Sequence, residues 1–177
     1  MSAVLRPAAP PWHRPMQTSD VDRVLALEVS AYSHPWTRGN FIDSLAAGYE
    51  AEMCFDASGP LIGYFVALPG FEESHLLNLA VAPAYQRQGH GLALLRRLTA
   101  WAQRRGDLAL WLEVRQSNHV AYALYQQFGF TEVGCRRDYY PAEHAKREDA
   151  RVMRLGLSAA QVPPFNAHDP GGQDAVV

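Results

Sequence analysis

The sequence has few cysteines, no long apolar run and no marked excess of either charge, and each absence excludes a class of function. Its two cysteines, Cys54 and Cys135, have neither metal-site nor redox spacing, so we expect reduced core thiols in a cytoplasmic protein without a metal. No apolar stretch approaches the ~20 residues of a membrane-spanning helix, and the N-terminus lacks the basic and apolar regions of a signal peptide. A formal net charge of −2 gives no indication of nucleic-acid binding.

What the sequence does contain is sufficient for one folded domain. The chain has 177 residues, of which 48 % are hydrophobic and 11 % aromatic, which is ample for a core. The prolines of residues 1–15 predict a flexible leader, and the prolines and glycines of residues 158–177 predict a disordered tail. We therefore expect a single domain over residues 16–157.

Hydrophobic periodicity predicts a mixture of helices and strands. Helices are expected after Thr18 or Ser19, after Thr37, over residues 92–101 and after Asn118, and strands over residues 50–55, 61–68, 74–81, 108–115, 130–136 and 150–157. Gly106 and Gly129 are placed to end two of the helices. In the strand over residues 108–115, alternation puts Leu108 on the same face as Leu110. The order predicts an α/β (mixed α+β) domain with a twisted mixed β-sheet and helices on both faces.

The most informative segment is the run Gln86-Arg87-Gln88-Gly89-His90-Gly91, which lies between a predicted strand and a predicted helix. Glycine lets successive backbone N–H groups turn toward one point without a Cβ in the way. The first N–H groups of a helix have no internal partners, and the helix dipole favours negative charge there. The segment therefore predicts a pyrophosphate site for a nucleotide-like cofactor, with an ordinary turn that caps a helix as the alternative.

The spacing of this segment narrows the class of cofactor. A Walker loop needs a Lys-Ser/Thr pair, and none follows Gly91. A dinucleotide fingerprint needs Gly or Ala where Leu94 stands. The remaining pattern, Gln/Arg-x-x-Gly-x-Gly, resembles the coenzyme A pyrophosphate loop of the GNAT acetyltransferase superfamily.

Further blocks extend this resemblance from about Pro15 to Leu157. They are Trp111-Leu112-Glu113-Val114-Arg115, Ala123-Leu124-Tyr125, Arg136-Arg137-Asp138-Tyr139-Tyr140-Pro141, Glu148-Asp149 and His34-Pro35-Trp36-Thr37. Together they resemble the RimI-type subfamily, whose members acetylate the N-terminal alanine of the eighteenth small-subunit ribosomal protein. The resemblance implies a GNAT acyl-CoA N-acyltransferase fold with a splayed acetyl-CoA cleft, acetyl-CoA as co-substrate, no metal, and a protein N-terminal peptide as acceptor.

The resemblance also implies roles for individual residues. Glu113 resembles the general base of the family and Tyr125 the general acid. The residues that match cofactor-binding positions are Leu79, Ala80, Val81, Arg87, Gln88, Gly89, His90, Gly91, Leu92 and Asn118. His90 departs from the family, whose members more often carry an apolar residue or Arg there. A cationic His90 near phosphates is expected to strengthen binding at mildly acid pH.

The chemistry of amide formation fits these residue types. An amine attacks a thioester only when it is deprotonated, and the pKa of a free α-amino group is about 7.7–8.0 against about 10.4 for lysine. Deprotonating lysine would therefore cost about 3.5 kcal/mol more at neutral pH, so one carboxylate acting through water suffices for an N-terminal amine. A phenol can supply the proton that the leaving thiolate needs. A backbone N–H on a splayed or bulged strand can stabilise the charge on the carbonyl oxygen.

Each candidate residue also has a plainer structural explanation. Glu113 could pair with Arg115, Tyr125 could be a core tyrosine on an apolar helical stripe, and Asn118 could only cap its helix. Their joint occurrence around the glycine loop is what favours a functional interpretation.

Three functions remain open at this point. The first is acetyl transfer to a protein N-terminus, with the peptide lying between the first two helices and the Tyr139-Tyr140 loop. Glu148 and Asp149 would then receive a basic side chain of the substrate. The second is acetylation of lysine side chains or small-molecule amines by the same core. The third is a non-catalytic acyl-CoA-binding module, which would need neither Glu113 nor Tyr125.

Overall fold

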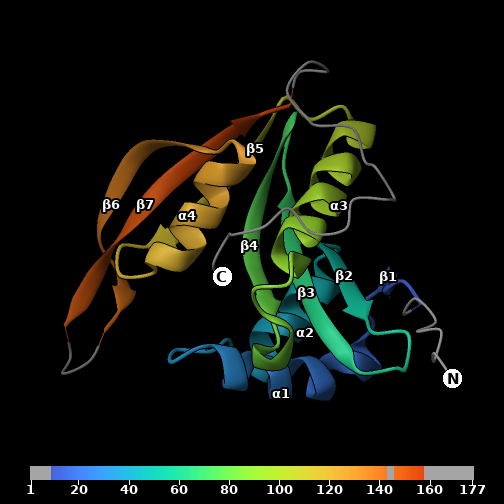
Figure 1. Ribbon diagram of the computed structural model, residues 1–177. Coiled ribbons are helices and arrows are strands. Elements are labelled where there is room, and N and C mark those ends of the chain that lie inside the picture. Colours follow the sequence, from blue (N-terminus) through green and yellow to red (C-terminus); the bar gives the residue numbers. More distant parts are fainter. Residues whose placement is uncertain (1–8, 143–145, 158–177) are drawn as a thin grey trace, which may run out of the picture.

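The protein is represented by a computed structural model that describes residues 9–142 and 146–157. This part of the chain forms one seven-stranded sheet and four α-helices (Figure 1). In chain order the elements are β1 (Trp12–Pro15), α1 (Val21–Ala31), α2 (Arg38–Ala46), β2 (Glu50–Phe55), β3 (Leu61–Pro69), β4 (Glu73–Val81), α3 (His90–Arg105), β5 (Ala109–Arg115), α4 (His119–Phe128), β6 (Thr131–Pro141) and β7 (Arg147–Gly156). Short 3₁₀ turns lie at Thr18–Asp20 and Pro83–Tyr85.

The strand order across the sheet is β1-β2-β3-β4-β5-β7-β6. All neighbouring strands are antiparallel except β4 and β5, which are parallel. A parallel pair needs a crossover connection, and α3 supplies it between β4 and β5. The predicted mixed sheet is therefore confirmed.

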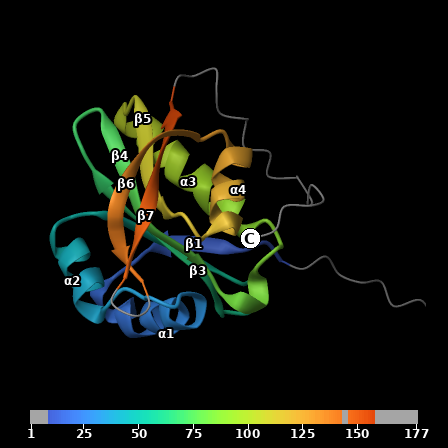
Figure 2. The same ribbon diagram turned by 90° about the vertical axis from the view of Figure 1, so that its left-hand side faces the viewer.

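The helices form two layers on opposite faces of the sheet, as Figures 1 and 2 show. One core cluster joins α3 and α4 to the sheet through Leu94, Leu98 and Leu124, which pack with Leu110 and Leu112 of β5. The other joins α1 and α2 to β2 and β3 through Val24, Phe41, Met53, Tyr64 and Val66. This arrangement confirms the expectation of helices on both faces.

The parallel strands β4 and β5 pair over only part of their length. Their register runs from Glu73 opposite Ala109 to Leu76 opposite Leu112, and no pairing follows. The register between β3 and β4 shifts at the same place, because Leu76 pairs with Ala67 while Asn78 pairs with Val66. Leu77 is the extra residue of this β-bulge. The two halves of the sheet meet at the top of Figure 1 and separate below it.

Helix ends follow the predicted capping rules with one exception. The hydroxyl of Thr37 accepts the N–H of Asn40 at 3.3 Å at the start of α2, and Gly106 and Gly129 end α3 and α4 with φ of 85° and 112°. The predicted cap of the first helix was wrong, because Thr18 and Ser19 lie inside the preceding 3₁₀ turn.

Four other expectations need correction. The last residues of the predicted leader form β1, which pairs with β2 from Trp12 opposite Phe55. Strands β6 and β7 are longer than predicted, reaching Pro141 and beginning at Arg147. Leu108 precedes β5 and is 62 % exposed instead of sharing the buried face. Cys54 is a buried free thiol as expected, whereas Cys135 is exposed. The predicted disordered tail, residues 158–177, lies outside the described residues.

Candidate active site

A cleft of about 860 Å³ opens where β4 and β5 separate. Its walls come from the loop after α1, the second half of β4, the end of β5, the start of α4 and the end of β6. The side chains of Glu113 and Tyr125, predicted as base and acid, both line it. Glu113 belongs to β5 and Tyr125 to α4. The separation of β5 from β4 therefore leaves both residues on the wall of one cleft.

The backbone of β4 presents alternate residues to this cleft. The N–H of Ala82 donates to Ile62 on β3 at 2.8 Å, so Ala80 also turns its polar groups toward β3, while Leu79 and Val81 turn theirs away from it. Leu79 and Val81 line the cleft, and Ala80 packs instead in the α1–α2 core. The carbonyl of Leu79 accepts the hydroxyl of Tyr32, and that of Val81 accepts Nε2 of Gln86 at 3.0 Å.

The glycine run forms the turn that leads into α3. Arg87 and Gly89 have positive φ angles of 61° and 82°, and Gly89 is the N-cap residue of α3. The N–H of Ala93 already donates to the carbonyl of Gly89, so the free N–H groups are those of the first turn. A small hollow surrounds these N–H groups and is lined by Arg87, Gly89, His90, Gly91 and Leu92. In the chain, these residues follow β4, which forms part of the cleft wall.

Two residues of the run differ from their predicted setting. The side chain of Gln88 donates to the carbonyl of Ala84 at 3.0 Å and is not part of the hollow. Burial lowers the pKa of His90, although Asp56 opposes this effect. His90 therefore takes up a proton at lower pH than an ordinary imidazole, which weakens the expectation of a cationic His90 at mildly acid pH.

Gly91 explains how closely α3 approaches α4. A Cβ built at Gly91 would lie 3.2 Å from Cδ2 of Leu124. Glycine at this position lets the start of α3, with its free N–H groups, pack directly against the helix that carries Tyr125.

Glu113 is held by side chains of β6 in this structure. Its Oε1 lies 2.7 Å from Nε of Arg136, and its side chain is 23 % exposed. The Glu113 carboxylate also raises the pKa of Tyr139. The hydroxyl of Tyr140 donates to the backbone carbonyl of Glu113 at 3.1 Å, and burial raises the pKa of Tyr140 to about 12. The predicted pairing with Arg115 is not formed, because Arg115 contacts Glu148 instead.

Tyr125 and Asn118 come from the helix that follows β5. Tyr125 is buried, and burial raises the pKa of its phenol well above the ordinary value, with Tyr140 adding to the effect. The phenol therefore stays protonated and can donate. Asn118 caps α4 by accepting the N–H of Ala121 at 3.0 Å, and it also lines the cleft. Its structural explanation as a helix cap is thus confirmed.

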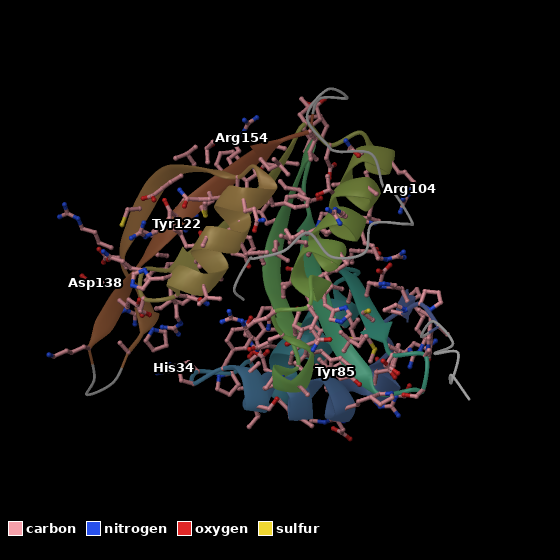
Figure 3. All side chains as sticks on the ribbon, viewed as in Figure 1. His34, Tyr85, Arg104, Tyr122, Asp138 and Arg154 are labelled. Atoms are coloured by element: carbon pink, nitrogen blue, oxygen red, sulfur yellow. The ribbon has the colours of Figure 1, made fainter. Side chains whose placement is uncertain are left out.

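The loop after α1 and the end of β6 face each other across the cleft. His34, Pro35 and Trp36 line one side, and Tyr140 and Pro141 line the other. Figure 3 labels His34 on its loop below the β6–β7 hairpin. The predicted acidic contacts are already used within the protein. Glu148 accepts the N–H of Ser117, and Asp149 accepts that of Asp138 at 2.9 Å.

Sequence reasoning missed three cleft residues that the fold brings together: Glu28, Tyr32 and Asn78. A usable signal existed for Glu28, because a carboxylate on the apolar stripe of a helix needs a partner when the helix packs. Tyr32 and Asn78 carry no such signal, because their neighbours come from distant parts of the chain.

The described residues contain no helix long and apolar enough to cross a membrane. Within the same residues, no group of three or more His, Cys, Asp or Glu side chains could hold a metal ion.

Comparisons with known proteins place the chain among transferases. Residues 21–130 match the family model described as the acetyltransferase (GNAT) family. A ribosomal protein bS18-alanine N-acetyltransferase from Escherichia coli strain K12 is 38 % identical over 143 residues, which cover 81 % of this chain and 95 % of that protein. The enzyme of the same name from Haemophilus ducreyi is 37 % identical over 138 residues, covering 78 % and 94 %.

A solved structure agrees with these sequence matches. The crystal structure of the ribosomal-protein-S18-alanine N-acetyltransferase from Escherichia coli superposes with a TM-score of 0.78 at 35 % identity, covering 89 % of this chain and 100 % of that one. The similarity therefore extends over the whole of the related enzyme.

Proposed function

The chain belongs to the acetyltransferase (GNAT) family, and we propose that it transfers acetyl from acetyl-CoA to the α-amino group of an N-terminal alanine. The proposed acceptor is the ribosomal protein bS18. Two relatives with this named activity are 37 % and 38 % identical to the chain over nearly their full length, which supports this substrate. The single structural observation behind the proposal is that Glu113 and Tyr125 line one cleft beside the free edge of β4.

The residues present fit acetyl-CoA at two places. The first-turn N–H groups of α3 and the positive φ of Gly89 suit the pyrophosphate, which would lie against Arg87, Gln88, Gly89, His90, Gly91 and Leu92. The cleft-facing groups of Leu79 and Val81 suit the amides of the pantetheine arm, with Ala80 between them paired to β3. Asn118 also lines the cleft and would contact acetyl-CoA near its thioester. Acetyl-CoA supplies the activated acetyl group.

Glu113 and Tyr125 perform the proton transfers in this proposal. Glu113 accepts a proton from the acceptor amine, directly or through water, once the amine displaces Arg136 from the carboxylate. Tyr125 donates a proton to the departing thiolate; burial raises the pKa of the phenol, so it carries this proton at neutral pH. A backbone N–H of β4 at the bulge residue Leu77 would stabilise the charge that develops on the carbonyl oxygen.

The test is turnover with purified protein and acetyl-CoA on a matched pair of peptides. One peptide begins with the alanine N-terminus of bS18, and the other has the same sequence with a blocked α-amine and a free internal lysine. We expect acetylation of the first only. Preference for the lysine peptide or for a small amine would replace this proposal with side-chain or small-molecule acetylation. Binding of acetyl-CoA without any turnover would favour a non-catalytic module.

A further inference from the structure

The cleft wall contains a second carboxyl group, Glu28, that the proposed reaction does not use. Glu28 lies on α1 and is 1 % exposed, within the core cluster of α1, α2, β2 and β3. Within the described residues no Lys, Arg or His side chain forms an ion pair with it. Burying a carboxylate without a cation is costly unless hydrogen bonds satisfy its oxygens. The hydrogen-bond donors around Glu28 therefore show which segments of the chain it holds in place.

Three donors from three parts of the chain reach Glu28. The N–H of Trp36 donates to Oε1 at 2.7 Å, Nδ2 of Asn78 donates to Oε1 at 3.1 Å, and the hydroxyl of Tyr64 donates to Oε2. Burial and the neighbouring carboxylate raise the pKa of Tyr64, so its hydroxyl remains a donor. Both oxygens of Glu28 are therefore occupied by protein donors.

Two of these donors lie on the loop after α1 and on β4, the two segments that must be aligned for acetyl transfer. Trp36 belongs to the loop that lines the acceptor side of the cleft. Asn78 follows the bulge residue Leu77, where β4 leaves β5 and faces the cleft. One helical turn after Glu28, the hydroxyl of Tyr32 binds the carbonyl of Leu79. The end of α1 thus holds two consecutive residues of the splayed strand and, through Glu28, the acceptor loop as well.

From this geometry we propose that Glu28 is a positioning residue that fixes the acceptor loop against the bulged segment of β4. The proposal rests on the proposed function, because it assigns the loop to the acceptor and β4 to the acetyl carrier. Glu28 acts through the Trp36 amide and Asn78, and the proton transfers remain with Glu113 and Tyr125. Losing Glu28 would leave the donors intact but allow the loop to move relative to the thioester.

The experiment compares Glu28→Ala with the conservative Glu28→Gln and with Glu52→Ala as the matched control. Gln keeps an acceptor oxygen for Trp36 and Asn78 and can donate to the Tyr64 hydroxyl. Glu52 is also a largely buried carboxylate, but it pairs with Arg97 and His13 and does not line the cleft. The measurements are KM for the N-terminal alanine peptide, kcat, acetyl-CoA affinity by calorimetry, and hydrogen exchange of the Trp36 amide.

We expect Glu28→Ala to raise the peptide KM, and so to lower kcat/KM, by about tenfold or more, because a displaced loop no longer holds the peptide in place; displacement of positioning groups can cost as much as 10²-fold in rate. Acetyl-CoA affinity should stay unchanged, and exchange at Trp36 should accelerate. Glu28→Gln should keep the peptide KM and the Trp36 exchange rate close to their wild-type values, and Glu52→Ala should change neither quantity. If Glu28→Ala does not fold, Asn78→Ala and Tyr64→Phe each remove one donor and should raise the peptide KM in the same direction.

Two results would overturn the proposal. One is that the peptide KM and the Trp36 exchange rate are both unchanged in Glu28→Ala. If that variant does not fold, the equivalent result is an unchanged peptide KM in both Asn78→Ala and Tyr64→Phe. The other is loss of kcat in Glu28→Gln as complete as in Glu113→Gln, which would make Glu28 a proton acceptor. Should the wild-type protein not acetylate the peptide at all, the proposed function fails, while exchange at Trp36 still decides whether Glu28 holds the loop.

Discussion

The Glu113 carboxylate and the Arg136 guanidinium form an ion pair of 2.7 Å across β5, β7 and β6, on the wall of the cleft. Arg136 is 58 % exposed on its side chain, so the pair is within reach of solvent. Exposed pairs of this kind contribute little to stability, about 0–1 kcal/mol. The pair can therefore open when an amine arrives, and it presents Glu113 as an oriented acceptor.

Replacing Glu113 by Gln keeps the size of the side chain but removes its ability to accept a proton. We expect kcat to fall by about 10²-fold or more, the range for loss of a general base. Acetyl-CoA affinity and thermal stability should change little, because the carboxylate does not contact the glycine loop. Steady-state kinetics with the alanine peptide and calorimetry with acetyl-CoA measure the two quantities. Wild-type kcat in this variant would remove Glu113 from the mechanism.

Arg136→Gln tests whether the ion pair orients the base, with Arg154→Gln as its control. Both arginines are exposed and lie on β6 and β7, but Arg154 stacks over Trp111 away from Glu113. We expect kcat/KM for the peptide to fall severalfold only in Arg136→Gln. Equal values in the two variants would mean that the carboxylate needs no such partner.

Tyr125→Phe should lower kcat by about 10²-fold, because the leaving thiolate loses its proton donor. Burial raises the pKa of Tyr125 above the ordinary value of about 10, so the protonated form persists beyond that pH. The ratio of wild-type to variant kcat should therefore stay constant between about pH 7 and pH 10. A ratio that falls toward one as the pH rises over this range would show that the phenol ionises below pH 10, against the effect of burial. A ratio of one at every pH would remove Tyr125 as the proton donor.

The sequence predicted those parts of the fold that depend on local pattern. Alternation and capping located β2 to β5 and all four helices, although the cap of α1 was wrong, and the glycine run located the turn into α3. The exceptions arise where tertiary contacts decide. Thr18 and Ser19 are good capping types, yet Asp20 forms the local contacts by accepting the N–H of Gln17 and the guanidinium of Arg14. Residues 12–15 become a strand only because the edge of β2 is available to pair with them.

The same distinction between local pattern and tertiary contact applies to the residues of the candidate site. Glu113 and Tyr125 were predicted from motifs, and both line the cleft. Glu28, Tyr32 and Asn78 could not be grouped from the sequence, because Glu28 contacts Asn78 and Tyr32 contacts Leu79, each about fifty residues away along the chain. Arg136 likewise reaches Glu113 only through the pairing of β6 with β7. Long-range register, which local patterns do not encode, decides these contacts.

Glu52 should make stability depend on pH in the acid range. Burial alone would raise its pKa, but the hydrogen bonds from Arg97 and the nearby His13 imidazole outweigh burial and lower the pKa to about 2. A depressed pKa means that the folded state binds this proton less readily than the unfolded chain, whose glutamate titrates near 4.3. The contribution of Glu52 is therefore fully present above about pH 5 and is lost as the pH falls toward 2.

The corresponding variant is Glu52→Gln, followed by thermal unfolding at several pH values. Its melting temperature should lie below that of the wild type at pH 7, and the difference should shrink as the pH falls from about 5 toward 2. A constant difference for Glu52→Gln from pH 7 to pH 3 would mean that the carboxylate is not held ionised by Arg97.

Gly89 allows backbone strain and ligand binding to be separated. Its φ is 82°, a Cβ there would meet nothing within 4 Å, and Gly48 at the end of α2 has the same open surroundings with a φ of 76°. Alanine at either position should cost about 1–2 kcal/mol of stability, because a side chain disfavours the left-handed region. Only Gly89→Ala should weaken acetyl-CoA binding, since the strain there shifts the N–H groups that face the pyrophosphate. Calorimetry measures the acetyl-CoA affinity of both variants, and their melting temperatures show whether the two substitutions destabilise the fold equally. Equal acetyl-CoA affinities would place the pyrophosphate away from the start of α3.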